Sequence, residues 1–160
     1  MIKLRADYQQ PVKDAVLDAW SRVRSVLAVM ATGAGKTVVF ASIIHDHKGA
    51  SAAVVHRKEI VVQISLSLAM LGVVHRIVAP PATVRLARRK HLAKFGKSFV
   101  DPGARCGVAS VQTLTSKSAE KDAALQSWVK QVTLCVFDEG HHYVATGLWS
   151  QAVDCMINAK

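Results

Sequence analysis

A glycine-rich turn near the start of the chain restricts the accessible folds more than any other feature. Residues 31–37 read Ala-Thr-Gly-Ala-Gly-Lys-Thr and follow an apolar run of strand type at residues 25–30. Residues 37–45, directly after the turn, are apolar nearly all round, as in a buried helix. Glycines let the backbone turn tightly between the two elements. A strand, a glycine turn and a buried helix in this order predict an α/β domain whose turn binds phosphate.

The residue types in this turn suit the phosphate chain of a nucleotide. Gly33 and Gly35 allow backbone N–H groups to converge on phosphate oxygens, beside the positive end of the following helix. Lys36 would reach the β- and γ-phosphates, and the Thr37 hydroxyl would bind Mg²⁺. The usual pattern G-x-x-x-x-G-K-[ST] is met in its second half, but Met30 stands where the first glycine belongs. The alternative interpretation is a glycine-rich turn with an incidental lysine. The candidate phosphate-binding residues are Thr32, Gly33, Ala34, Gly35, Lys36 and Thr37.

Two adjacent carboxylates, Asp138 and Glu139, follow an apolar run of strand type at residues 132–137. Ligands of open parallel sheets bind at the carboxyl ends of strands, so we expect this pair at the edge where the phosphate turn also opens. Asp138 would hold Mg²⁺, and Glu139 would orient and deprotonate the water that attacks the γ-phosphate. Zinc at His141 and His142 is disfavoured, because adjacent histidines rarely share a metal and no further ligand lies at zinc spacing.

Apolar runs alternate with helical patterns along the rest of the chain. Further strands are expected at residues 52–55, 73–79, 103–111 and 132–137, and further helices at 8–23, 58–71, 82–95, 119–129 and 148–157. Continuous apolar strands joined by helices indicate a parallel sheet that is covered on both faces. A chain of 160 residues has the length of one domain. The expected fold is therefore a three-layer α/β domain with a mainly parallel sheet flanked by helices.

Positive charge is unevenly distributed along the chain. The net charge is +10, and residues 76–105 contain eight basic residues and a single acid. Such a segment favours polyanions through counterion release, and we expect Arg88, Arg89 and Lys90 to contact nucleic acid. The alternative is a solvated helix face that only keeps the protein in solution.

Cysteine usage and hydropathy indicate the compartment. Three cysteines form no CxxC pair, which favours reduced thiols over a disulfide framework or a thiolate zinc site. No apolar run is long enough to cross a bilayer, and the first residues lack the pattern of a secretory signal. We expect a cytoplasmic protein without a membrane partner.

With both motifs placed, the chain resembles the first motor domain of helicase superfamily 2, the DEAD/DEAH-box (DExH) helicases. The resemblance is strongest to the branch of type III restriction enzyme subunits and phage helicases. Residues 4–10, Leu-Arg-Ala-Asp-Tyr-Gln-Gln, resemble the glutamine motif of that family, which implies that Gln9 reads the adenine edge with Arg5 or Tyr8 packed nearby. Residues 138–141, Asp-Glu-Gly-His, match its Walker B box, which implies that His141 couples the nucleotide site to the next motif.

Two further segments resemble nucleic-acid-binding motifs of the same family. Residues 54–59, Val-Val-His-Arg-Lys-Glu, imply a contact of Arg57 with the nucleic-acid backbone, and residues 109–114, Ala-Ser-Val-Gln-Thr-Leu, imply contacts of Gln112 and Thr113 with the same strand. The resemblance implies a RecA-like P-loop NTPase fold that binds ATP, Mg²⁺ and nucleic acid. The family branch favours DNA over RNA and a bacterial or phage-infected cell.

The motif III of this family, a Ser/Thr-Ala-Thr stretch, does not occur in the chain, and neither does a second motor domain. We therefore expect residues 1–160 to be the ATP-binding half of an ATP-dependent helicase, with weak or no hydrolysis alone and a separate second helicase domain as a candidate partner. A truncated gene, a split subunit or an excised domain would each give such a chain. The alternatives are a nucleic-acid-binding module and an inert remnant of a helicase gene.

Overall fold

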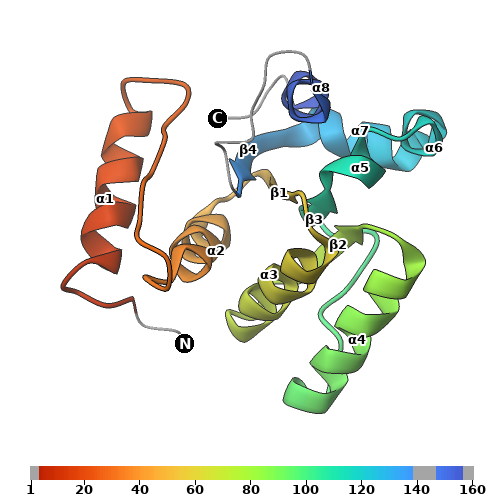
Figure 1. Cartoon of the computed structure of the whole chain (residues 1–160), viewed down its shortest axis with the longest axis horizontal. Coiled ribbons are helices and arrows are strands. Elements are labelled where there is room, and N and C mark those ends of the chain that lie inside the picture. The colour runs from red at the N-terminus through yellow and green to blue at the C-terminus, as the bar shows by residue number, and fades with distance from the viewer. Residues whose placement is uncertain (1–3, 139–146, 157–160) are drawn as a thin grey trace.

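The computed structural model describes residues 4–138 and 147–156, and its centre is a sheet of four parallel strands (Figure 1). The strands are β1 (Ala50–Val55), β2 (His75–Val78), β3 (Cys106–Ser110) and β4 (Val132–Phe137), in the order β2-β3-β1-β4. β1 pairs in parallel with β3 and β4, and β2 pairs in parallel with β3. The expected parallel sheet is confirmed, and the described strands all direct their carboxyl ends to one edge.

Helices cover both faces of this sheet. The helices that the structure describes are α1 (Gln9–Trp20), α2 (Lys36–Asp46), α3 (Lys58–Met70), α4 (Pro81–Phe95), α5 (Val111–Leu114), α6 (Lys117–Lys121), α7 (Ala123–Gln131) and α8 (Leu148–Cys155). Alternate residues of a strand point to opposite faces, so Ala53 and Val55 pack among α1, α2 and α3 while Ala52 and Val54 pack among α5, α7 and α8. The three-layer α/β architecture is therefore confirmed.

α4 lies outside these layers. It packs against α3, on the opposite side of the view from α1 (Figure 1). In the described part of the chain, no helix has the length and apolar character needed to cross a bilayer.

Residues 25–30, predicted as the strand before the glycine turn, do not form a strand but an irregular connection from α1 to α2. Val26 and Met30 pack against the core, whereas Leu27 is 81% exposed and Val29 is 84% exposed. The prediction was wrong because an apolar run shows only that a segment has the composition of a buried strand. Whether it forms a strand depends on a neighbouring strand edge, which distant parts of the sequence provide.

Two predicted elements also differ from the expectation, one by division and one by an earlier end. The predicted helix at residues 119–129 is divided, because the Asp122 carboxylate accepts the Leu125 N–H at 3.0 Å and so caps a new helix, α7. The predicted strand at residues 103–111 ends at Ser110, whose hydroxyl accepts from the Thr113 N–H and caps the short helix α5. In both cases a short polar side chain competes with the backbone for its hydrogen bonds.

A neutral polar network joins α3, β2 and α4 inside the fold. Ser65, His75 and His91 have no exposed surface, and the Ser65 hydroxyl lies 2.7 Å from His75 Nε2 and 3.0 Å from His91 Nε2. His75 Nδ1 donates to the Val73 carbonyl at 2.9 Å, and His91 Nδ1 accepts the Phe99 N–H at 3.3 Å. A single direction of donation satisfies every atom: His91 Nε2–H to Ser65, and the Ser65 O–H to His75. Both histidines are therefore neutral, and burial lowers the pKa of His75 to about 4.

Candidate nucleotide and nucleic-acid site

The glycine turn forms a left-handed bend that begins α2. Gly33 and Gly35 have φ angles of 82° and 83°, which side chains rarely allow. The Ala34 N–H donates to the Ala31 carbonyl at 3.1 Å and closes the turn, and Gly35 is the N-cap of α2. Among the described residues no side chain caps this helix, so its first N–H groups are available to an anion.

Lys36 is the first residue of α2 and is exposed, and the half-buried Thr37 follows it. The Lys36 ammonium donates to the Met30 carbonyl at 3.1 Å, a contact that joins the two ends of the turn. An exposed hydrogen bond of this kind contributes little, and a charged phosphate oxygen is a stronger acceptor than a carbonyl. The lysine can therefore exchange this contact for a phosphate.

The glutamine motif touches the phosphate turn directly. Gln9 Nε2 donates to the Ala34 carbonyl at 3.0 Å, and Gln9 Oε1 accepts the Arg5 N–H at 3.0 Å. A side chain at position 35 would come within 2.5 Å of Gln9 Nε2, so Gly35 is needed for this approach as well as for its positive φ. The Arg5 guanidinium packs over the Tyr8 ring and donates to its hydroxyl at 3.1 Å. Two segments that the sequence suggested separately are therefore in contact.

Asp138 lies at the carboxyl end of β4, and its N–H donates to the Val54 carbonyl of β1 at 3.1 Å. α2 ends at Asp46, just before β1 begins at Ala50, so the helix runs back along the sheet and its first turn faces the carboxyl edge. The phosphate turn and Asp138 thus belong to the same edge of the sheet. The predicted catalytic residues Glu139 and His141 lie outside the described residues, and their roles stay predictions.

The residues predicted to bind nucleic acid also follow strands at this edge. Arg57 is the exposed N-cap of α3, directly after β1, and Gln112 lies in α5, directly after β3. Gln112 Nε2 lies 3.1 Å from the ring of His56, which joins the two strand ends. The Thr113 hydroxyl accepts from Ser110 at 2.9 Å. The sequence analysis did not predict a role for His56. Its position next to Arg57, a predicted nucleic-acid contact, was the one signal for it in the sequence.

The basic segment proves to be mainly one helix, α4, whose inner face carries Thr83, Ala87 and His91. Arg85, Arg88 and Arg89 are spaced i, i+3 and i+4, so they share an outer face, and all three are exposed. None of the three forms an ion pair with another described residue. The predicted contact Lys90 is exposed too but points to a different side of the helix, whereas Arg85 is an addition from the structure.

Thiol chemistry has no support in the described part of the chain. Burial raises the pKa of Cys106 to about 11 and also raises the pKa of Cys135. Both thiols therefore stay protonated near neutral pH and are poor nucleophiles and metal ligands. No three His, Cys, Asp or Glu side chains of the described residues are grouped as metal ligands.

Comparison with known proteins agrees with this fold. The family described as "Type III restriction enzyme, res subunit" matches residues 2–160. IRC3 of Saccharomyces cerevisiae, named as an ATP-dependent helicase, is 30% identical over an alignment of 150 residues, and the match covers 87% of this chain and 19% of IRC3. The crystal structure of the UvsW helicase from bacteriophage T4 superposes with a TM-score of 0.61 at 18% identity, over 98% of this chain and 50% of that one.

This chain thus spans about a fifth of the yeast protein and half of the phage helicase. The family match covers almost every residue, and the structural likeness shows the helicase fold. The chain belongs to the type III restriction enzyme res-subunit family and has the fold of a first RecA-like domain of helicase superfamily 2.

Proposed function

We propose that this chain is the ATP-binding half of an ATP-dependent helicase or translocase, which binds Mg·ATP at the glycine turn and nucleic acid along the carboxyl edge of the sheet. The contact of Gln9 with Ala34 carries the proposal, because it joins the residue expected to read adenine to the turn expected to bind phosphate. The identity to IRC3, a protein named as an ATP-dependent helicase, supports the same activity.

The groups at the site fit ATP and Mg²⁺ chemically. The open N–H groups of α2 and the Lys36 ammonium would neutralise the phosphates. Thr37 and Asp138 supply hydroxyl and carboxylate oxygens, the ligands that Mg²⁺ prefers, and bound Mg²⁺ would neutralise charge on the β- and γ-phosphates. Glu139 would activate the attacking water, and His141 would couple the nucleotide site to the nucleic-acid site.

The Gln9 amide can bind adenine without giving up its present contacts. Nε2 uses one of its two hydrogens on Ala34, and Oε1 uses one of its two lone pairs on the Arg5 N–H. The remaining donor and acceptor match the N7 acceptor and the N6 donor that adenine presents on one edge. Adenine preference therefore follows from an amide that is already oriented on the phosphate turn.

Turnover by this chain alone should be weak. In phosphoryl transfer of this class, arginine fingers contribute roughly three to five orders of magnitude in rate. The chain spans half of the UvsW structure, and a second helicase domain would supply such groups. We expect DNA rather than RNA as the polymer that crosses Arg57, Gln112 and Thr113.

ATP binding tests the site assignment. Isothermal titration with Mg·ATP should show binding that falls about ten- to hundredfold in Lys36→Ala, because a charge-assisted hydrogen bond contributes roughly 1.5–3 kcal/mol. Lys121→Ala is the matched control, since Lys121 is exposed on α6, away from the turn. Equal ATP affinity in Lys36→Ala and in the wild type would contradict the assignment. A thermal transition without cooperativity would instead favour an inert remnant.

A second candidate function is a nucleic-acid-binding module, and the unpaired arginine face of α4 favours it. Duplex binding should depend steeply on salt, and each arginine of that face changed to Gln should reduce the slope of log K against log[salt] by about 0.9. Arg88→Gln and Arg89→Gln should act alike, while Lys121→Gln, at an exposed lysine of α6 outside the basic segment, serves as the matched control. Binding that ignores ATP would favour the module, and binding that changes with ATP would favour the helicase.

A further inference from the structure

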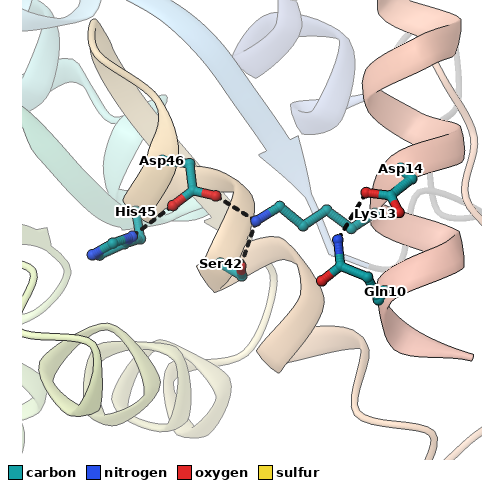
Figure 2. Close-up of polar contacts among 6 residues, drawn as sticks. All are labelled: Gln10, Lys13, Asp14, Ser42, His45 and Asp46. Atoms are coloured by element: carbon teal, nitrogen blue, oxygen red, sulfur yellow. Dashed lines mark hydrogen bonds and ion pairs between the residues drawn. The ribbon is translucent and has the colours of Figure 1, made fainter. Parts of the chain in front are cut away.

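Lys13 is a buried cation on the inner face of α1. Only 8% of the residue is exposed, which is rare for lysine. Its ammonium crosses from α1 to α2, where it donates to the Ser42 hydroxyl at 2.8 Å and pairs with the Asp46 carboxylate (Figure 2). Asp46 also contacts His45 Nδ1 at 2.7 Å, and the Lys13 hydrogen bond, followed by the His45 one, lowers the pKa of Asp46. The bridge therefore holds a charged lysine against a charged carboxylate.

The same two helices carry the contact between the glutamine motif and the phosphate turn. Gln9 and Lys13 are four residues apart and so lie on one face of α1, and Ser42 and Asp46 are four residues apart on one face of α2. α1 therefore makes two polar contacts with the next part of the chain. The Gln9 amide contacts the phosphate turn just before α2, and the Lys13 ammonium contacts the second half of α2. The Gln9 contact orients the Gln9 amide, and the Lys13 contact holds α1, the helix that carries Gln9, against α2.

Apolar packing between α1 and α2 cannot fix that orientation by itself. Val12, Val16 and Trp20 pack in the same cluster as residues of α2, but apolar contacts have no direction. An ion pair with one buried partner, here Lys13, adds little to stability relative to apolar side chains of similar volume, whereas its geometry can select one arrangement of two elements. Such a bridge is best explained by the orientation that it imposes.

We propose that Lys13 is a positioning residue for adenine recognition: its bridge to Ser42 and Asp46 holds α1 on α2 so that the Gln9 amide stays on the phosphate turn in the orientation that accepts adenine. The proposal rests on the proposed ATP site and adds a residue to it. Lys13 itself touches no nucleotide. Its effect should therefore appear in base selectivity and not in phosphate affinity.

The test compares Mg·ATP, Mg·GTP and inorganic triphosphate by titration calorimetry. Lys13→Met keeps the apolar stem and removes the charge, and it should reduce the ratio of ATP to GTP affinity about two- to tenfold, the range of one net hydrogen bond. Triphosphate affinity should stay at the wild-type value. The exchanged pair Lys13→Asp with Asp46→Lys should restore part of the ATP preference, because the bridge can form in reverse.

A matched control lies beside the end of the same helix. Arg22, two residues after α1, also pairs with an acid, Asp18 of the last turn, but both side chains are exposed, so Arg22→Met should leave the ATP to GTP ratio unchanged. Equal weakening of ATP, GTP and triphosphate in Lys13→Met would overturn the proposal, since that pattern marks a change in the phosphate turn or in folding.

The outcome also separates this proposal from the one on which it rests. If Gln9→Ala removes the ATP preference but Lys13→Met retains it, the ATP site stands and the role of Lys13 is refuted. If the wild type shows no ATP preference that depends on Gln9, adenine reading by this motif fails, and the role of Lys13 fails with it.

Discussion

Two helix pairs of this domain are held together by polar contacts of opposite kind, one charged and half-exposed, the other neutral and buried. α1 and α2 are joined by the charged pair of Lys13 and Asp46, whose carboxylate side chain is 52% exposed. α3 and α4 are joined by the neutral network around Ser65, which has no exposed surface. Water can replace one partner of the first junction, but it cannot reach the second unless the helices separate. Movement between helices is therefore less costly beside the nucleotide site than beneath the basic helix.

Acid should weaken the α3–α4 junction first. Burial lowers the pKa of His75 from its ordinary 6.5 to about 4 and also lowers the pKa of His91. Between those two values the unfolded chain binds a proton that the folded chain does not, so stability present above pH 6.5 is lost as the pH falls toward 4. At about 1.4 kcal/mol per pKa unit, His75 alone accounts for about 3 kcal/mol. Urea unfolding across this pH range measures the loss.

Two histidine variants locate that acid sensitivity. In His75→Gln the residue no longer titrates, so the free energy of unfolding should depend less on pH. It should also be lower at neutral pH, because the substitution disturbs the buried hydrogen bonds of His75. His45→Gln removes an exposed histidine of α2 and should lower the free energy of unfolding at neutral pH less than His75→Gln does. An unchanged slope in His75→Gln would show that the acid sensitivity arises elsewhere.

Removal of the Ser65 hydroxyl should have the next largest effect. Ser65→Ala leaves His75 Nε2 without its donor and His91 Nε2–H without its acceptor, both inside the core. Each unsatisfied buried group costs roughly 1–3 kcal/mol, so we expect a total loss of about 2 kcal/mol or more in chemical denaturation. Ser67 lies on the same helix, and its exposed hydroxyl donates to the Gln63 carbonyl of its own helix, so Ser67→Ala should change little. An equal decrease in the free energy of unfolding in Ser65→Ala and Ser67→Ala would contradict the special role of the buried network at the α3–α4 junction.

The smallest stability change is expected at the α1–α2 junction. Lys13→Met should alter the free energy of unfolding by less than about 1 kcal/mol, because the stem still packs and the half-exposed Asp46 regains water. Because the folded state lowers the pKa of Asp46 below its ordinary 3.8, Asp46 contributes its full stabilisation above pH 3.8 and loses it only below that pH. The α1–α2 junction should therefore persist as the pH falls toward 4, where the histidine network is lost. A loss in Lys13→Met as large as that in Ser65→Ala, measured in the same urea series, would contradict this comparison.

Local sequence patterns predicted most of the fold because buried strands and helices each have a local signature. Residues 132–137 and 82–95 are examples, where β4 and α4 were found. The glycine turn was likewise recognisable, because the positive φ angles at positions 33 and 35 favour glycine, and glycine is visible in the sequence. Residues 25–30 failed for the opposite reason: their pairing depends on an edge elsewhere in the chain.

The two polar junctions could not be predicted, because their partners are far apart in sequence. Lys13 and Asp46 are separated by 33 positions, and Ser65 and His91 by 26. One signal was present: Lys13 occupies the same helix face as Val16 and Trp20, where an apolar residue would be usual. A lysine on the inner face of a helix requires a charged or polar partner, but the sequence does not identify that partner.

The irregular connection at residues 25–30 offers a natural reporter for the site that it precedes. In the part of the chain that the structure describes, none of its backbone amides is paired in the sheet. Amides without such pairing exchange hydrogen with solvent rapidly, whereas those of β1, which is flanked by strands on both sides, exchange only when the structure opens. A nucleotide that orders the adjoining phosphate turn would therefore slow deuterium uptake in this connection and leave the centre of the sheet as an internal standard.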